Sequence, residues 1–178
     1  MIGALTKKLA EIAFPREPRK PWGAINTYAK CERSVQRHLE SIGIDSYLPV
    51  MTLYDRRGKK LRKVLQIPQY IFASWDCHDH PSLCTAKNKM QRERLHRLAQ
   101  EDSVVTSMFY CRRLELISEY YPVEVRSGAV PGQETTLDSG ELAGSRGFLS
   151  AEEGREFFCL PLDVEHYARI LLSRGKTA

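Results

Sequence analysis

Apolar positions recur at helical spacing at the start of the chain. In residues 3–13, Leu5, Leu9 and Ile12 follow the i, i+4, i+7 spacing of an amphipathic helix. Three prolines in residues 14–21 then exclude a longer helix, because proline has no amide hydrogen to donate. The pattern predicts a short helical arm.

A second apolar stripe lies in residues 30–43 and gives the clearest helix prediction in the chain. Val35, Leu39 and Ile42 lie on one face, and charged residues fill the positions between them. Gly43 follows at the position where a helix commonly ends in the left-handed conformation.

Strand-like patterns surround this helix. Residues 22–29 predict a first strand, with Trp22 as one core residue. Residues 44–55 and 63–76 predict two more strands, which form a hairpin around the polar loop 55–63.

Alternation in the last of these strands predicts two distinct faces. Tyr70 and Phe72 point to one side and Ile71 to the other, and Pro68 indicates where the strand begins. Helices could cover both faces, or one face could be an apolar docking patch for another protein. We expect Ile71 to face the core, and Tyr70 and Phe72 to face a partner.

The remaining patterns complete an α+β class. Residues 88–100 predict a basic helix, residues 103–110 a β-branched strand, and residues 164–172 a short helix or a strand followed by a helix. Beyond Tyr121, short apolar runs alternate with Gly, Pro, Asp and Ser, which is typical of a small β-barrel or a set of hairpins.

Composition predicts a folded, soluble, intracellular protein. The chain is 42% hydrophobic and 28% charged, and no apolar run approaches a membrane span. Five cysteines, an odd number, do not indicate a disulfide framework. Residues 1–127 hold 22 Lys and Arg against 14 Asp and Glu, whereas residues 128–163 hold 2 against 7. The basic first part is a candidate nucleic-acid-facing region.

Charge is densest at the predicted hairpin tip. Its six cations are Arg56, Arg57, Lys59, Lys60, Arg62 and Lys63. They could neutralise phosphates, or the tip could be a solvated loop. Five further cations in residues 87–97 favour proximity to nucleic acid, while no helix-turn-helix or zinc-finger pattern indicates base-specific reading of a duplex.

Chemistry for a metal site or a reaction is scarce. Cys77, His78, His80 and Cys84 have the right ligand types for zinc, but structural zinc sites usually bring ligand pairs from two separated knuckles. We interpret this segment as a polar loop and expect neither a metal nor a cofactor. Because no phosphate loop, nucleophile elbow or zinc-protease motif is present, we do not expect an enzyme.

The order of these motifs resembles the N-terminal domain (NGN domain) of NusG-type transcription elongation factors, most of all the specialised RfaH-like paralogues. Residues 22–76 supply a Trp-led strand, a helix ending in "HLE", the strand "YLPVMTL", a basic loop and a "P-x-Y-x-F" strand. Residues 92–110 fit the family's second helix and the strand after it.

The resemblance implies a bacterial, cytoplasmic antitermination or elongation factor that suppresses pausing or termination. Its partners would be the clamp helices of the largest RNA polymerase subunit and nearby non-template or upstream DNA. By position, the polymerase-binding residues are Ile67, Pro68, Tyr70 and Phe72. The nucleic-acid-binding residues are Arg37, His38 and the six cations of the hairpin tip. The alternative is a stand-alone basic nucleic-acid-binding protein.

Some residues depart from the family pattern. Ile67 replaces a common phenylalanine, and Gln69 stands where glycine or asparagine is usual. Ala24 and Asn26 replace larger residues of the first strand. These changes could weaken docking or retune it to a different polymerase.

The resemblance also divides the chain. We expect an arm at 1–20, an NGN-like antiparallel sheet with flanking helices at 21–118, and a KOW-like β module at 119–178. Gly128 and Gly132 fit the KOW pattern "V-x-V-x-x-G-x-x-x-G". A ribosomal protein or Rho would be the candidate partner of this module.

The alternative is one enlarged NGN domain with an inserted β-hairpin region at residues 111–160. Residues 163–172 would then form its last helix. The short spacing between the two domains leaves this alternative open.

Overall fold

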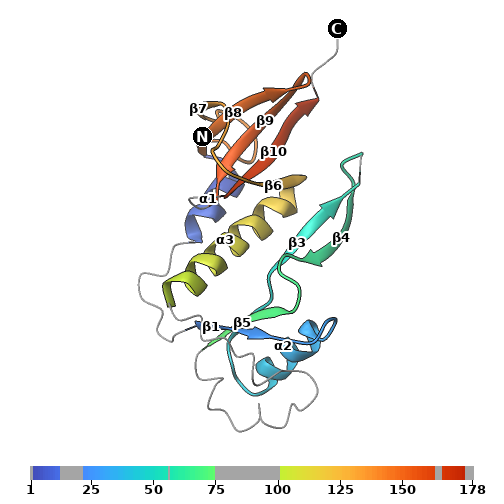
Figure 1. The fold of residues 1–178 in the computed structure, drawn as a ribbon. Helices are drawn as coiled ribbons and strands as arrows, with labels where there is room; N and C mark the ends of the chain where they lie inside the picture. The colour runs from blue at the N-terminus through green and yellow to red at the C-terminus, as the bar shows by residue number, and fades with distance from the viewer. Residues whose placement is uncertain (1, 13–21, 56, 75–100, 163–165, 175–178) are drawn as a thin grey trace. The chain divides into compact units, whose positions relative to one another are not determined.

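A computed structural model of the chain describes residues 2–12, 22–55, 57–74, 101–162 and 166–174 (Figure 1). The chain forms two compact units, and each is described by itself. Unit 1 contains residues 1–13, 51–64 and 112–178. Unit 2 contains residues 14–50 and 65–111.

The sheet of unit 2 has the strand order β1-β5-β2 and is antiparallel. Its strands are β1 (Trp22–Asn26), β5 (Tyr70–Ser74) and β2 (Ser46–Tyr47). Asn26 pairs with Tyr70 at one end of the β1–β5 ladder. In this register, neighbouring residues of β5 point to opposite faces of the sheet.

Helix α2 (Glu32–Ser41) covers one face of this sheet. Ile71 is completely buried and packs in the same core cluster as Val35 and Leu39 of the helix. The predicted helix and its apolar stripe are therefore confirmed. Gly43 has a φ of 77° just after the helix, as its position predicted.

The opposite face of the sheet is covered by the part of α3 (Glu101–Tyr120) that belongs to unit 2. A second core cluster joins Phe72 and Ala24 of the sheet to Val104 and Met108 of the helix. Helices therefore cover both faces of β5. This is the first of the two alternatives given for this strand, the second being an apolar docking patch.

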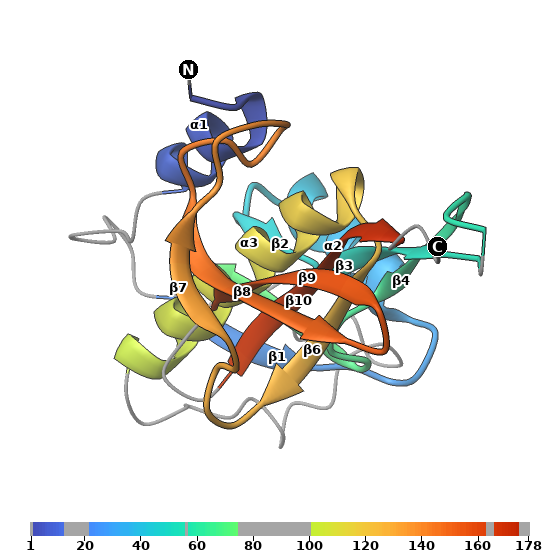
Figure 2. The ribbon, with the colours of Figure 1, turned by 90° about the horizontal axis from the view of Figure 1, so that it is seen from above.

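Unit 1 is built around a five-stranded antiparallel sheet with the order β6-β10-β9-β8-β7 (Figure 2). The strands are β6 (Val123–Ser127), β7 (Gln133–Thr136), β8 (Arg146–Glu152), β9 (Arg155–Pro161) and β10 (His166–Arg174). The β6–β7 connection contains Gly128 and Gly132, which have φ values of 102° and 105°. This β-rich sheet fits the small β module expected for the C-terminal part of the chain.

Arg169 of β10 links several strands of this sheet. Its guanidinium group contacts Glu124 of β6 at 3.5 Å and Glu152 of β8. It also lies 3.6 Å from the ring centroid of Phe157 on β9. The Arg169 side chain is only 13% exposed, whereas Glu124 and Glu152 are 54% and 63% exposed. The guanidinium group therefore lies against the sheet while its carboxylate partners stay in contact with solvent.

Helix α1 (Ala4–Glu11) packs on the segment between β7 and β8. The amides of Gly3 and Leu5 donate to the carbonyl oxygens of Ala143 and Glu141, at 2.8 and 3.0 Å. The Leu5 side chain is fully buried. The arm predicted from the sequence is therefore a helix, and it is an integral part of unit 1.

The remaining elements of unit 1 are a two-stranded ribbon and the second part of α3, from Arg112 onward. The ribbon pairs β3 (Val50–Tyr54) with β4 (Lys60–Leu65). The Thr52 amide donates to Oγ of Ser118 on α3 at 2.9 Å. The ribbon is therefore anchored to the helix through a buried hydrogen bond.

Three sequence predictions of secondary structure are wrong. Residues 103–110 lie in α3 rather than in a strand. Residues 166–174 form a strand, so the final helix of the single-domain alternative is absent from this segment. The stretches 44–55 and 63–76 each contain two strands rather than one. The helix predicted at 88–100 lies outside the described residues.

Prolines lie at both of these strand breaks. Pro49 separates β2 from β3, and Pro68 lies between β4 and β5. Because proline cannot donate to a sheet ladder, a continuous central strand is disfavoured at either position. Pro68 therefore precedes β5 in a turn and does not itself open the strand.

Candidate functional site

The tip of the β3–β4 ribbon is organised by one carboxylate. Oδ1 of Asp55 accepts hydrogen bonds from the amides of Arg57 and Lys59, both at 2.8 Å. Gly58 takes the left-handed conformation with a φ of 78°. The basic stretch is thus a turn followed by strand β4, so the prediction of a single loop is only partly correct.

The cations of this ribbon face solvent. Lys63 forms an ion pair with Glu119 at 2.9 Å, and both side chains are about half exposed. No described acidic residue pairs with the other exposed cations of the ribbon, which are Arg57, Lys59, Lys60 and Arg62. Arg56 lies outside the described residues. We call these four described cations the ribbon cations.

A groove of about 740 Å³ lies beside the same strand. It is lined by Thr52, Lys60, Leu61, Arg62, Lys63, Glu119 and Tyr120. The Leu61 side chain is 61% exposed, so an apolar contact is available among the charges. The chemistry of the groove suits an anionic, extended ligand better than a small neutral one.

Tyr54, the last residue of β3, links the ribbon to α3. Its hydroxyl donates to the carbonyl oxygen of Ser118 at 2.8 Å. Burial raises the pKa of Tyr54 above its ordinary value of 10.0, and the charge of Glu119 raises it further. The phenol is therefore neutral at physiological pH and donates this hydrogen bond.

The other predicted nucleic-acid residues belong to unit 2. Arg37 of α2 is exposed, and its Nε donates to the carbonyl oxygen of Arg33 at 3.3 Å. His38 is half-buried on the same helix. These residues and the ribbon cations therefore lie in different compact units.

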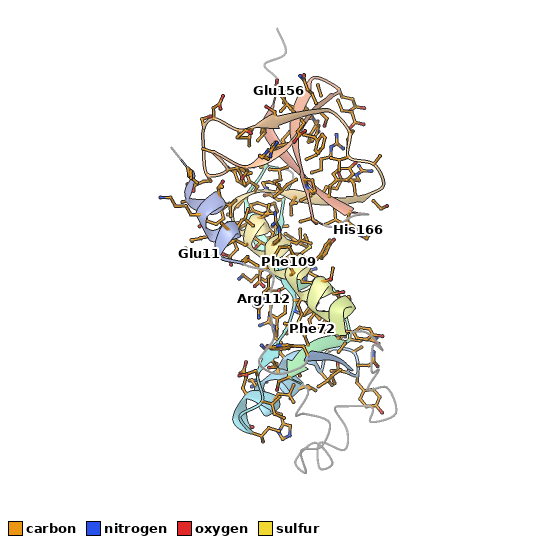
Figure 3. All side chains as sticks on the ribbon, turned by 90° about the vertical axis from the view of Figure 1, so that its left-hand side faces the viewer. Glu11, Phe72, Phe109, Arg112, Glu156 and His166 are labelled. Atoms are coloured by element: carbon orange, nitrogen blue, oxygen red, sulfur yellow. The ribbon has the colours of Figure 1, made fainter. Side chains whose placement is uncertain are left out.

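The four predicted polymerase-binding residues differ in how far their side chains are exposed. Pro68 is exposed, whereas Ile67 and Tyr70 are half-buried and pack against the cluster under α3. Phe72, labelled in Figure 3, is 3% exposed. Its ring stacks on Tyr47 with centroids 6.1 Å apart. The expectation of an exposed Phe72 is wrong, because α3 covers this face of the sheet.

A feature missed by sequence reasoning joins the turn before β5 to α2. Gln69 has a φ of 67°, a conformation that glycine and asparagine adopt more readily. Its amide donates to Oε1 of the buried Glu32 at 3.0 Å. The sequence did carry one signal for this conformation: glycine or asparagine, which tolerate a positive φ, is usual at this position in the family.

The described part of the chain shows no candidate metal site. It contains no group of three or more His, Cys, Asp or Glu residues that could hold a metal ion. The Cys77, His78, His80 and Cys84 segment lies outside it. No helix among the described residues is long and apolar enough to cross a membrane.

The chain is an α+β protein. It has one antiparallel sheet with a helix on each face, a second, five-stranded antiparallel sheet, and a basic two-stranded ribbon. Residues 20–109 match the family model NusG, described as transcription termination factor nusG. The chain therefore belongs to the NusG family. Members of this family are transcription factors rather than enzymes, and they bind RNA polymerase. A comparison with curated proteins gives no match.

Proposed function

We propose that this protein is an antitermination or elongation factor that binds the clamp helices of RNA polymerase and nearby DNA to suppress pausing or termination. The family match over residues 20–109 carries this proposal. The exposed, unpaired ribbon cations support the DNA contact, because each could neutralise a phosphate. The bacterial and cytoplasmic setting is part of the same proposal.

The proposed polymerase contact is the apolar surface at the turn before β5. Pro68 is its exposed residue, and Ile67 and Tyr70 are partly accessible beside it. Phe72 supports Tyr70 from within the core cluster rather than offering a free surface. Aromatic residues at such positions often dominate the affinity of an interface.

Polymerase capture with the full chain tests this contact. Tyr70→Ala is expected to lower retention of polymerase, whereas Tyr70→Phe keeps the ring and most of the binding. Circular dichroism and thermal unfolding of each variant verify that the fold is intact. Undiminished capture by a folded Tyr70→Ala variant would show that this surface is not the docking site.

Stand-alone nucleic-acid binding is the second candidate function, and the ribbon cations favour it. Replacing Arg57, Lys59, Lys60 and Arg62 with glutamine should weaken DNA binding. It should also reduce the slope of log affinity against log salt by about 0.7 to 0.9 per lost contact. Lys63→Gln is the matched control, since Glu119 already pairs with Lys63 and a smaller change is expected.

The two candidates predict different requirements for polymerase. Tight, steeply salt-dependent DNA binding by the isolated protein favours the stand-alone function. Weak binding that becomes firm only with polymerase favours the elongation factor. The three-part domain division, the KOW assignment and a ribosomal protein or Rho as partner of the β module belong to the elongation-factor proposal.

A further inference from the structure

Gln69 lies in the turn between β4 and β5, and its side chain is exposed. Its φ of 67° is an angle that glycine adopts without steric cost and that other residues adopt rarely. Its side-chain carboxamide forms no hydrogen bond with another described residue. An exposed glutamine is common, so the position is of interest only if the local turn does not explain its backbone angle.

Local turns do explain the other two described non-glycine residues with a positive φ. Glu153 lies with Gly154 in the tight β8–β9 hairpin, and both central residues of a favoured hairpin turn have a positive φ. Lys30 is the third residue of a turn that the Cys31 amide closes by donating to the carbonyl oxygen of Tyr28 at 3.0 Å. One common turn type has a positive φ at its third residue.

The turn at Gln69 is held by other elements instead. Strands β4 and β5 belong to different sheets, so their connection is not a hairpin. The Gln69 amide donates to Oε1 of Glu32 on α2 at 3.0 Å. The carbonyl oxygen of Gln69 accepts from the amide of Thr27, just after β1, at 2.7 Å. Tertiary contacts therefore maintain the strained angle.

Both residues that hold the turn are inside the fold. Glu32 lies in the first turn of α2 and is 4% exposed, and Thr27 is 2% exposed. The backbone of Gln69 is thus fixed from within unit 2 while its side chain stays accessible. A side chain that is kept at a steric cost, where glycine would avoid that cost, is a candidate for a functional contact.

The surface around Gln69 is otherwise apolar along the chain. Pro68 is exposed, and Ile67 and Tyr70 are half-buried. No charged residue lies between Gln66 and Ser74. A single polar group within an apolar surface selects the orientation of a partner, because an orientation that buries the group without a hydrogen bond is penalised.

We propose that the side-chain carboxamide of Gln69 is a hydrogen-bonding contact of the docking surface for RNA polymerase, and that Glu32 is the residue that positions it. This inference rests on the proposed function, because it takes polymerase as the partner. It adds a polar contact to the apolar one proposed for Tyr70. The carboxamide supplies both donors and an acceptor, so backbone groups or polar side chains of polymerase are suitable partners.

Titration of the full chain with purified core RNA polymerase of its host tests the contact. Gln69→Ala removes the carboxamide, and Gln69→Gly removes both the carboxamide and the backbone strain. Each should raise the dissociation constant about 5-fold to 150-fold, because a buried group of polymerase loses its hydrogen-bond partner. Gln69→Gly should also unfold at a higher temperature than the unmodified chain. Unchanged affinity in both variants overturns the inference.

Lys30→Gly is the matched control for the glycine substitution. It also places glycine at an exposed position of positive φ in unit 2, but at one where the local turn explains the angle. The variant should keep the polymerase affinity of the unmodified chain. A loss equal to that of Gln69→Gly would assign the effect to backbone flexibility and would overturn the contact.

Substitutions of Glu32 test its positioning role. Glu32→Ala removes the acceptor of the Gln69 amide, so hydrogen exchange at this amide should become faster and polymerase binding weaker. Glu32→Gln keeps an oxygen at the same position and should restore both. Weaker binding without faster exchange at the Gln69 amide would show that Glu32 does not act through this turn.

Tyr70→Ala separates failure of this inference from failure of the proposed function. If Tyr70→Ala loses polymerase while Gln69→Ala and Gln69→Gly bind it normally, only the Gln69 contact is wrong. If the unmodified chain binds no polymerase, the proposed function fails and the Gln69 contact fails with it.

Discussion

Gln69 shows how one backbone angle can explain a residue preference. Its φ of 67° costs an ordinary residue about 1 to 2 kcal/mol relative to the right-handed region. Hydrogen bonds at its amide and its carbonyl oxygen hold the turn regardless. Glycine would adopt the same angle without the steric cost, although it loses more entropy on folding.

We therefore expect Gln69→Gly to raise the free energy of unfolding by roughly 0.5 to 1 kcal/mol. Urea denaturation followed by circular dichroism measures the change. Gln36→Gly is the matched control, because Gln36 lies inside α2, where glycine costs about 1 kcal/mol. Destabilisation by both substitutions would contradict the strain assigned to Gln69.

Phe72 illustrates how a residue expected at an interface can instead be part of the core. Phe72→Ala is expected to lower the free energy of unfolding by about 3 to 5 kcal/mol, since it leaves a cavity between the sheet and α3. Tyr70→Ala, at a half-buried position, should cost less. Equal and small losses in chemical denaturation would show that Phe72 is not enclosed.

At the scale of elements, the β3–β4 ribbon depends on a hydroxyl group that titrates at high pH. The folded-state pKa of Tyr54 lies above its ordinary value of 10.0 because of burial. The stability linked to this shift is therefore complete below about pH 10 and is lost as the pH rises through the folded-state pKa.

We expect the free energy of unfolding to fall above about pH 10, and Tyr54→Phe to reduce the steepness of that fall. Denaturation curves measured at several pH values test this. Burial also raises the pKa of Tyr121, so Tyr121→Phe should remove a separate part of the slope. An unchanged slope in the Tyr54→Phe variant would contradict the assignment.

Helix α3 forms against the local propensity of its sequence. Residues 103–110 are rich in β-branched and aromatic side chains, which favour strands. The buried residues of α3 include Val104, Met108, Cys111 and Leu114, whose spacing of three and four is helical. Burial of this stripe outweighed the weaker local preference.

At the scale of the whole molecule, segments far apart in the sequence form one unit. Unit 1 combines the N-terminal arm, the β3–β4 ribbon and the C-terminal part of the chain. Gly3 lies where α1 meets the segment before β8, and a side chain there would collide with the carbonyl oxygen of Glu141. The close approach of these two backbones therefore requires glycine.

Gly3→Ala is accordingly expected to destabilise the chain by about 1 to 3 kcal/mol, as overpacking does elsewhere. It should also speed hydrogen exchange at the Leu5 amide, which donates to Glu141. Ala4→Ser adds one atom at an exposed neighbouring position and should change stability by less than about 0.5 kcal/mol. Identical exchange in both variants would argue against the docked arm.

The sequence by itself determined the elements whose signals are local. Apolar stripes at helical spacing defined α1 and α2, alternation separated Ile71 from Tyr70 and Phe72, and the motif order indicated the NusG family. Only the tertiary structure decided that α3 is a helix, that it covers Phe72, and that α1 packs on the segment between β7 and β8. Those outcomes depend on which apolar surfaces meet, and no local pattern encodes such contacts between distant segments.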